Sequence, residues 1–172
     1  ILRCLVGSEM CIRDRLCSMG HMVMISNFSE YYKLVQYLTR YTKKQLGLTM
    51  GVSNFIEIFK EQYYDNLKGG VLEAFGNIFK NNMKVYLYPL LDKDTGEIIN
   101  SDNLKLEDNM KEFYKYFKVN NKIRDLEFNH NFLEIFSKDI LKKIKNNEKG
   151  WQDKVPKAIS KMIVKNKMFG YK

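Results

Sequence analysis

Cysteine, proline and long apolar runs are scarce in this chain. Its 172 residues include three cysteines and two prolines. Cys4 and Cys11 lie in the first fifteen residues, which are treated separately below, so Cys17 has no cysteine partner. A lone cysteine cannot form an intrachain disulfide and lacks the neighbours of a metal site. We therefore interpret Cys17 as a small buried apolar residue rather than a nucleophile.

No stretch approaches the roughly 18 apolar residues that a membrane-spanning helix requires. No secretory signal follows the first fifteen residues, and within them 1–6 is too short to be one. These absences predict a cytoplasmic protein without a membrane partner. Hydrophobic residues make up 45% of the chain and aromatic residues 13%, which is ordinary for a globular domain with a core of its own.

The first fifteen residues, Ile1 to Arg15, resemble the translated read-through of a sequencing adapter, above all in the fragment VGSEMCIRD. Foreign segments are set aside before a fold is argued. We therefore expect the genuine sequence to begin near Leu16, inside a structural unit. The chain would then be the C-terminal piece of a larger protein, with the missing N-terminal region as its first partner.

Positive charge is concentrated in the second half. Residues 16–102 carry nine basic and nine acidic side chains, whereas residues 103–172 carry seventeen and nine. A basic segment is one mark of a nucleic-acid-binding protein. However, only Arg40 and Arg124 are arginines after residue 15, and the many Lys, Asn and Ile residues are typical of an AT-rich genome. Arginine is the usual bidentate ligand of phosphates and bases, so the sequence favours a solvated lysine-rich surface over nucleic-acid binding.

The first part of the chain alternates strands with helices. We predict strands at 22–26, 46–50 and 83–91, and amphipathic helices at 28–41, 54–64 and 71–79. The second helix should bury Phe55, Ile58 and Phe59, and the third should bury Val71, Leu72, Phe75 and Phe79. Asn27 and Glu30 have the spacing of a capping box for the first helix. Pro89 predicts that the far end of the third strand lies at an edge or leaves the sheet. The turn residues of 92–97 and the change in charge place a boundary between Asp92 and Asn103.

Beyond this boundary every periodic segment is helical. We predict helices at 107–118, at 131–144 with a break at Ser137, and from Pro156 to about Met168. The fold class is therefore α/β: a small three-stranded sheet with flanking helices over 16–102, followed by a basic helical subdomain over 103–172. A sheet of three strands covered on both faces leaves its edges open, which independently favours missing N-terminal strands.

The predicted strand end at Ser26 and Asn27 is the best candidate for a ligand site. In open α/β sheets, ligands bind beyond the carboxyl ends of the strands, and a helix N-terminus attracts anions. Ser26 and Asn27 could therefore bind a phosphate, joined by Thr49 at the end of the second strand. The alternative is that Ser26 and Asn27 only cap the helix.

Other polar residues have simpler interpretations. His21 and His130 lack the partners of a triad or a metal site. Asp92, Asp94 and Glu97 fit a turn better than a calcium loop. The lysines of 142–145 are expected on a solvated helix face, and the recurring tyrosines in the core. The sequence contains no P-loop, GxGxxG motif or nucleophile elbow, and we predict no metal site.

Several stretches resemble the C-terminal part of a bacterial protein family, over nearly the whole chain from Leu16. They are MVMISNFSEYYKLVQYLTRYT, LGLTMGV, GGVLEAFGNIFKNNMKVYLYPLLDKDTGEIINSDNL, LEIFSKDILKKI, WQDKVP and the final MFGY. Members of this family are labelled nicotinate- or nicotinamide-nucleotide adenylyltransferase. The resemblance implies a nucleotide-binding enzyme that uses ATP and Mg²⁺. No catalytic residue carries over, because the paired-histidine motif of nucleotidyltransferases does not occur here. The alternatives are a non-catalytic scaffold or interaction module and a basic nucleic-acid-binding domain.

Overall fold

The structure is a computed structural model that describes residues 13–14 and 16–171. Most of the segment expected to be foreign, 1–15, lies outside these residues. The chain divides into two compact units. The sheet unit runs from Phe28 to Glu134, and the second unit combines the residues before Phe28 with those from Ile135 onward. Within the second unit we call residues 135–171 the helical region.

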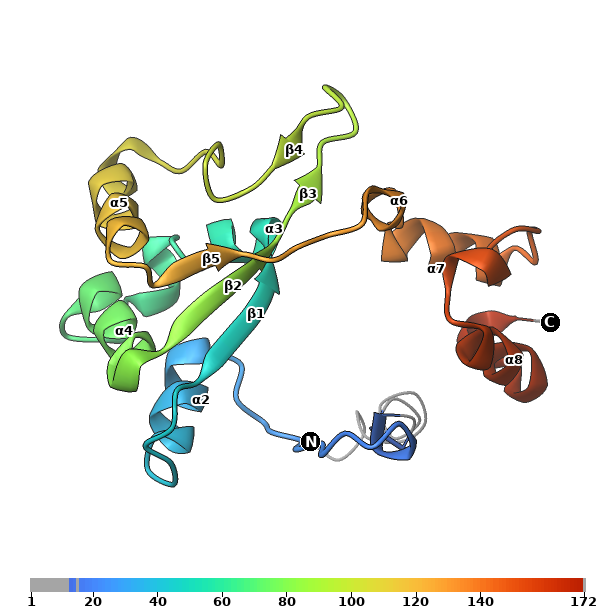
Figure 1. Cartoon of the computed structure of the whole chain (residues 1–172), viewed down its shortest axis with the longest axis horizontal. Helices are drawn as coiled ribbons and strands as arrows, with labels where there is room; N and C mark the ends of the chain where they lie inside the picture. Colours follow the sequence, from blue (N-terminus) through green and yellow to red (C-terminus); the bar gives the residue numbers. More distant parts are fainter. Residues whose placement is uncertain (1–12, 15, 172) are drawn as a thin grey trace. The chain divides into compact units, whose positions relative to one another are not determined.

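A three-stranded parallel sheet forms the centre of the sheet unit (Figure 1). Its strands are β1 (Gly47–Gly51), β2 (Lys84–Tyr88) and β5 (Ile123–Asp125), in the order β1-β2-β5. The predicted α/β fold, a small three-stranded sheet with flanking helices, is therefore confirmed. The strands predicted at 46–50 and 83–91 are confirmed as β1 and β2.

Pro89 ends β2, as its missing amide predicts. The chain then forms a short antiparallel hairpin of β3 (Leu90–Leu91) and β4 (Ile98–Ile99). Its turn is held by the Asp92 carboxylate, whose Oδ1 accepts from the Asp94 amide at 2.9 Å. This hydrogen bond holds the pKa of Asp92 below its ordinary value. The predicted turn at 92–97 is therefore confirmed.

The strand predicted at 22–26 is wrong. This segment has no regular secondary structure, and Met22, Met24 and Ile25 are exposed. An apolar run becomes a buried strand only when a neighbour satisfies its backbone groups, and among the described residues none pairs with it. The third strand is β5 instead, in the region predicted to be all helical. β5 has three residues and only Ile123 is buried, so it has no apolar run that periodicity could detect.

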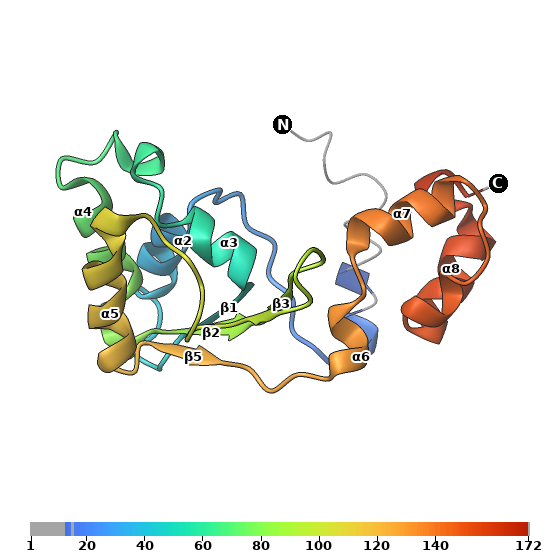
Figure 2. The same ribbon diagram turned by 90° about the horizontal axis from the view of Figure 1, so that it is seen from above.

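Four helices accompany the sheet: α2 (Tyr31–Leu38), α3 (Val52–Glu57), α4 (Gly70–Ile78) and α5 (Lys111–Val119). The 3₁₀ turns η2 (Glu61–Tyr64), η3 (Lys80–Asn82) and η4 (Asp108–Met110) lie between them. Figure 2 shows the helices of this unit gathered on one side of the sheet. The strand order explains this, because right-handed crossovers that advance in one direction place their helices on the same face.

The opposite face of the sheet carries a row of paired residues. Thr49 of β1 pairs with Tyr86 of β2, and Tyr86 pairs with Arg124 of β5. Thr49 and Arg124 are exposed and Tyr86 is half-buried, whereas Val85 and Leu87 on the helical side are fully buried. The expectation of a sheet covered on both faces therefore does not hold within the sheet unit. We call Thr49, Tyr86 and Arg124 the open face.

Phenylalanine rings fill the space between the helices and the sheet. Phe75 of α4 lies at the centre, with ring centroids 4.7 Å from Phe59, 5.1 Å from Phe113 and 5.4 Å from Phe117. Phe59 is buried as predicted. The prediction that Leu72 is buried is wrong, since 64% of it is exposed. The buried stripe of α4 follows Ala74, Phe75 and Ile78 instead.

The helical region contains α7 (Ser137–Lys145) and α8 (Lys157–Asn166), and α6 (His130–Leu133) precedes it at the end of the sheet unit. A new helix begins at Ser137, and Pro156 stands at the start of α8, as predicted. Trp151 is fully buried against Ile144 and Ile163. Its Nε1–H has no hydrogen-bond partner among the described residues.

The compact units do not follow the boundary predicted between Asp92 and Asn103. The sheet unit continues to Glu134, since α5 and β5 complete its core and its sheet. Parallel pairing with β2 holds residues 123–125 in this unit although they follow the predicted boundary.

Candidate functional site

The predicted phosphate ligands belong to two different compact units. Ser26 and Asn27 are exposed and belong to the second unit, whereas Thr49 lies in the middle of β1 on the open face. The predicted capping box is wrong, because α2 begins at Tyr31 with Glu30 in the cap position and no side-chain cap bond. Binding of phosphate by Ser26, Asn27 and Thr49 therefore stays a prediction. The predicted strand at 22–26, whose end was the reason for it, is absent.

Three other candidates have exposed side chains. His21 and His130 are exposed, and the His130 ring packs 5.0 Å from the Phe128 ring. The prediction that Cys17 is buried is wrong, because its thiol is free and exposed. Among the described residues, no three His, Cys, Asp or Glu side chains lie close enough to hold a metal ion.

A pocket of about 510 Å³ lies inside the sheet unit. It is formed where the start of α2 meets α3 and η2, and three segments supply its walls: Ser29, Glu30 and Tyr31; Asn54, Glu57 and Ile58; Tyr63 and Tyr64. We call it the tyrosine pocket. α3 begins directly after β1 ends, and Asn54 in its first turn is the lining residue that follows β1 most closely in the chain.

One wall of the tyrosine pocket is fixed by Tyr64. Its hydroxyl donates to the Ile58 carbonyl oxygen at 2.7 Å, and its ring meets Tyr32 edge to face at 6.2 Å. Burial raises the pKa of Tyr64 to about 12. The phenol is therefore neutral at neutral pH, and its proton is already donated to the Ile58 carbonyl oxygen. Tyr64 shapes the pocket, and it does not supply a free catalytic group.

Two carboxylates line the pocket, and each is held by a lysine three residues later. Glu57 Oε1 lies 2.6 Å from Lys60 Nζ, and Glu30 Oε1 lies 2.5 Å from Lys33 Nζ. These hydrogen bonds hold the pKa of both carboxyl groups below their ordinary value. Tyr63 Oη also donates to Glu57 Oε2 at 3.1 Å. Both carboxylates are therefore ionised at neutral pH and act as acceptors.

This arrangement suits a ligand that brings hydrogen-bond donors and a flat ring. Ionised carboxylates accept from hydroxyl or amino groups, and aromatic rings offer surfaces for stacking. Lys33 and Lys60 supply positive charge beside the carboxylates. Sequence reasoning missed the pocket because it assigned the tyrosines to the core. The usable signal was the pair of Glu and Lys residues at a spacing of three, in 30–33 and 57–60.

A second polar cluster joins the loop after β4 to α5. The Ser101 carbonyl oxygen accepts from Tyr114 Oη and from Lys118 Nζ, both at 2.5 Å. Lys118 Nζ also lies 2.6 Å from Asp102 Oδ1. Each donor ends on a backbone or carboxylate oxygen of the same loop, so the cluster fixes the loop and offers no free group to a ligand.

No family model, curated protein or solved structure matches this chain. Among the helices of the described residues, none has the length and apolar character needed to cross a membrane.

Proposed function

We propose that the sheet unit binds a nucleotide and belongs to an enzyme that transfers an adenylyl group from ATP to a pyridine mononucleotide. The chain would be the C-terminal part of that enzyme, working in the cytoplasm. Three features support this proposal: the parallel α/β sheet, the tyrosine pocket, and the resemblance described above. Mg²⁺ would neutralise the phosphates of ATP, and no described residue is assigned to it.

The two ionised carboxylates of the tyrosine pocket carry the proposal. The hydroxyls of a ribose are donors, and carboxylates that are acceptors only suit them. Glu57 is already oriented by Lys60 and Tyr63, so a sugar would meet a fixed acceptor. The exposed ring of Tyr63 offers a stacking surface to the base. Phosphates would then lie toward Lys33 and Lys60.

Glu57→Gln tests the proposal, with Glu97→Gln as the control. Titration of the full chain with ATP and with nicotinamide mononucleotide, followed by calorimetry, measures the affinity. A hydrogen bond to a charged group is worth roughly 1.5–3 kcal/mol, so we expect at least a tenfold rise in Kd from E57Q. Glu97 is exposed in the 92–97 turn, so E97Q should leave Kd unchanged. Equal affinity of E57Q and wild type would remove the pocket from the proposal.

The predicted phosphate ligands need a separate test. Ser26→Ala combined with Asn27→Ala removes both side chains from an exposed segment, so folding should be unaffected. A loss of affinity for ATP, with affinity for the dephosphorylated nucleoside retained, would support phosphate binding there. Unchanged affinity for ATP would show that Ser26 and Asn27 do not belong to the proposed site.

The open face supports a second candidate function, a non-catalytic interaction module. All-parallel sheets are almost always covered on both faces, yet Thr49 and Arg124 are exposed. A helix from a partner protein would suit this face. Binding of an apolar dye to the isolated chain, reduced by Tyr86→Ser, would favour this function. An absence of dye binding, together with nucleotide binding, would favour the enzyme.

A further inference from the structure

Almost all of the surplus positive charge of the chain lies at its C-terminal end, which carries +8 of the formal net charge of +9. Residues 28–134, the sheet unit, carry fifteen basic and fifteen acidic side chains. Residues 135–172 carry eleven lysines, no arginine and three acidic residues, a net charge of +8. The change in charge coincides with the boundary between the compact units at Glu134 and Ile135. The structure therefore assigns the charge to one part of the molecule.

Genome composition does not explain this surplus. An AT-rich genome replaces arginine with lysine, but it does not remove aspartate and glutamate. The sheet unit has the same preference for lysine and still balances every basic residue with an acidic one. Excess charge of one sign weakens a compact state by self-repulsion. A surplus restricted to the helical region therefore indicates a partner of opposite charge.

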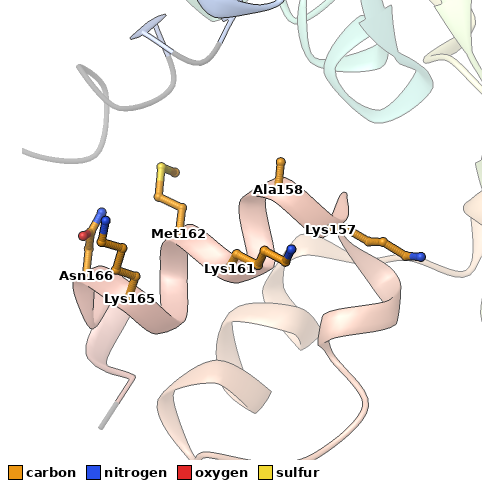
Figure 3. Close-up of a pocket in the computed structure, with 6 residues that line it drawn as sticks. All are labelled: Lys157, Ala158, Lys161, Met162, Lys165 and Asn166. Atoms are coloured by element: carbon orange, nitrogen blue, oxygen red, sulfur yellow. The ribbon is translucent and has the colours of Figure 1, made fainter.

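Helix α8 presents part of this charge as a regular row. Lys157, Lys161 and Lys165 are exposed and stand four residues apart, so they lie about 6 Å apart along one side of the helix. Figure 3 shows them with Ala158, Met162 and Asn166 beside them. In the described part of the chain, no ion pair neutralises these three lysines. The other side of α8 packs Ile163 against Trp151.

Helix α7 repeats this division of faces. Lys138, Lys142 and Lys145 follow one another at spacings of four and three residues, and all are exposed. Ile144 of the same helix is buried in the small core. Both helices therefore use their apolar side to hold the region together and leave their lysines to the solvent.

We propose that the helical region docks on the phosphate backbone of a nucleic acid without regard to sequence. Lysine rows neutralise successive phosphates and release their counterions. The lack of arginine removes the usual ligand for base edges, which makes the binding non-specific. An anionic membrane fits less well, because interfacial helices insert a broad apolar face. Here that face is buried, and the large exposed apolar side chains are scattered: Leu141, Val164 and Phe169.

The test measures binding of the full chain to a fluorescein-labelled 20-nucleotide single-stranded DNA by anisotropy over a series of salt concentrations. The variant is Lys157→Glu, Lys161→Glu and Lys165→Glu together. The control carries the same change in net charge in the sheet unit: Lys43→Glu, Lys68→Glu and Lys80→Glu, all exposed. The emission of Trp151 verifies that the helical region remains folded in both variants.

We expect the α8 variant to bind at least tenfold more weakly, and the control to bind within threefold of wild type. The slope of log K against log salt should fall by about 2 in the α8 variant, since each contact with a single-stranded phosphate contributes roughly 0.7. An equal loss of affinity in both variants would mean that binding depends on the net charge of the chain and not on the lysines of α8, and would overturn the proposal. Binding to phosphatidylserine vesicles but not to the oligonucleotide would overturn it as well.

Discussion

Ser101 donates two hydrogen bonds to the carboxylate of Asp125. Its backbone N–H lies 3.0 Å from Asp125 Oδ1, and its Oγ lies 2.5 Å from Asp125 Oδ2. Ser101 is buried, with 6% of its surface exposed. The pair ties the loop after β4 to the last residue of β5, so a strand of only three residues gains a second attachment to the sheet unit.

Loss of the Asp125 carboxylate should therefore destabilise the sheet unit. Asp125→Ala leaves the amide and the hydroxyl of Ser101 without acceptors, which costs about 1–2 kcal/mol in the free energy of unfolding. Urea denaturation followed by far-UV circular dichroism measures this loss. Asp65→Ala is the matched control, because Asp65 is exposed in a turn. Equal stability of the two variants would show that the pair contributes nothing.

Two tyrosines should make the fold sensitive to alkaline pH. Burial raises the pKa of Tyr64 and of Tyr114 to about 12, from an ordinary value of 10.0. The folded state therefore holds these protons more tightly than the unfolded state. Their contribution to stability is complete below pH 10 and is lost as the pH rises from 10 to 12.

Urea denaturation at a series of pH values measures this effect. The free energy of unfolding should fall between pH 10 and 12, and the fall should be shallower in the double variant Tyr64→Phe, Tyr114→Phe. Tyr41→Phe is the control, since Tyr41 is exposed. A double variant with the same pH dependence as wild type would contradict the burial of these phenols.

Truncation of two residues of α4 should change stability by very different amounts. Phe75 is fully buried among aromatic rings, so Phe75→Ala should cost about 3–5 kcal/mol. Leu72 is largely exposed three residues earlier, so Leu72→Ala should change stability by less than about 0.5 kcal/mol. Chemical denaturation of both variants checks the orientation of α4. A large loss from L72A would mean that the buried stripe predicted from periodicity was right.

The single tryptophan reports on the helical region by itself. That region has a core of three buried residues, and the unsatisfied Nε1–H of Trp151 costs about 1–3 kcal/mol. Regions of roughly 40 residues or fewer rarely have a stable core of their own. Trp151 emission should therefore change at a lower urea concentration than the near-UV circular dichroism of the tyrosines, most of which lie in the sheet unit. Coincident transitions would show that the two units unfold together.

Periodicity in the sequence predicted the elements that have a buried stripe. Strands β1 and β2 follow from apolar spacing, as does the burial of Phe55 and Phe59. The helix predicted at 54–64 is divided into α3 and the 3₁₀ turn η2. The prediction of a strand at 22–26 was wrong because burial depends on more than apolar character. Its residues are as apolar as those of β2, but whether such a run is buried depends on a neighbouring strand, which is a property of the whole fold.

The Glu–Lys spacings in the sequence mark two carboxylates, but they do not predict that both line one pocket. The tyrosine pocket arises where the first turn of α2 meets α3 and η2, and these segments are separated along the chain. Local pattern identified Glu30 as part of a capping box, whereas the structure pairs it with Lys33 beside the pocket. Tertiary proximity decides which polar groups face a common cavity, and spacing along one segment does not determine it.

The parallel order of the strands also sets the course of folding. Each pairing joins residues far apart in the chain, since Leu48 lies beside Val85 and Val85 beside Ile123. Long loops must close before these contacts form, so folding should be slow compared with that of a helical bundle. During synthesis, one edge of β2 remains unpaired until β5 leaves the ribosome. That interval is when this unit is most exposed to aggregation, and it lasts at least while residues 89–122, between β2 and β5, are synthesised.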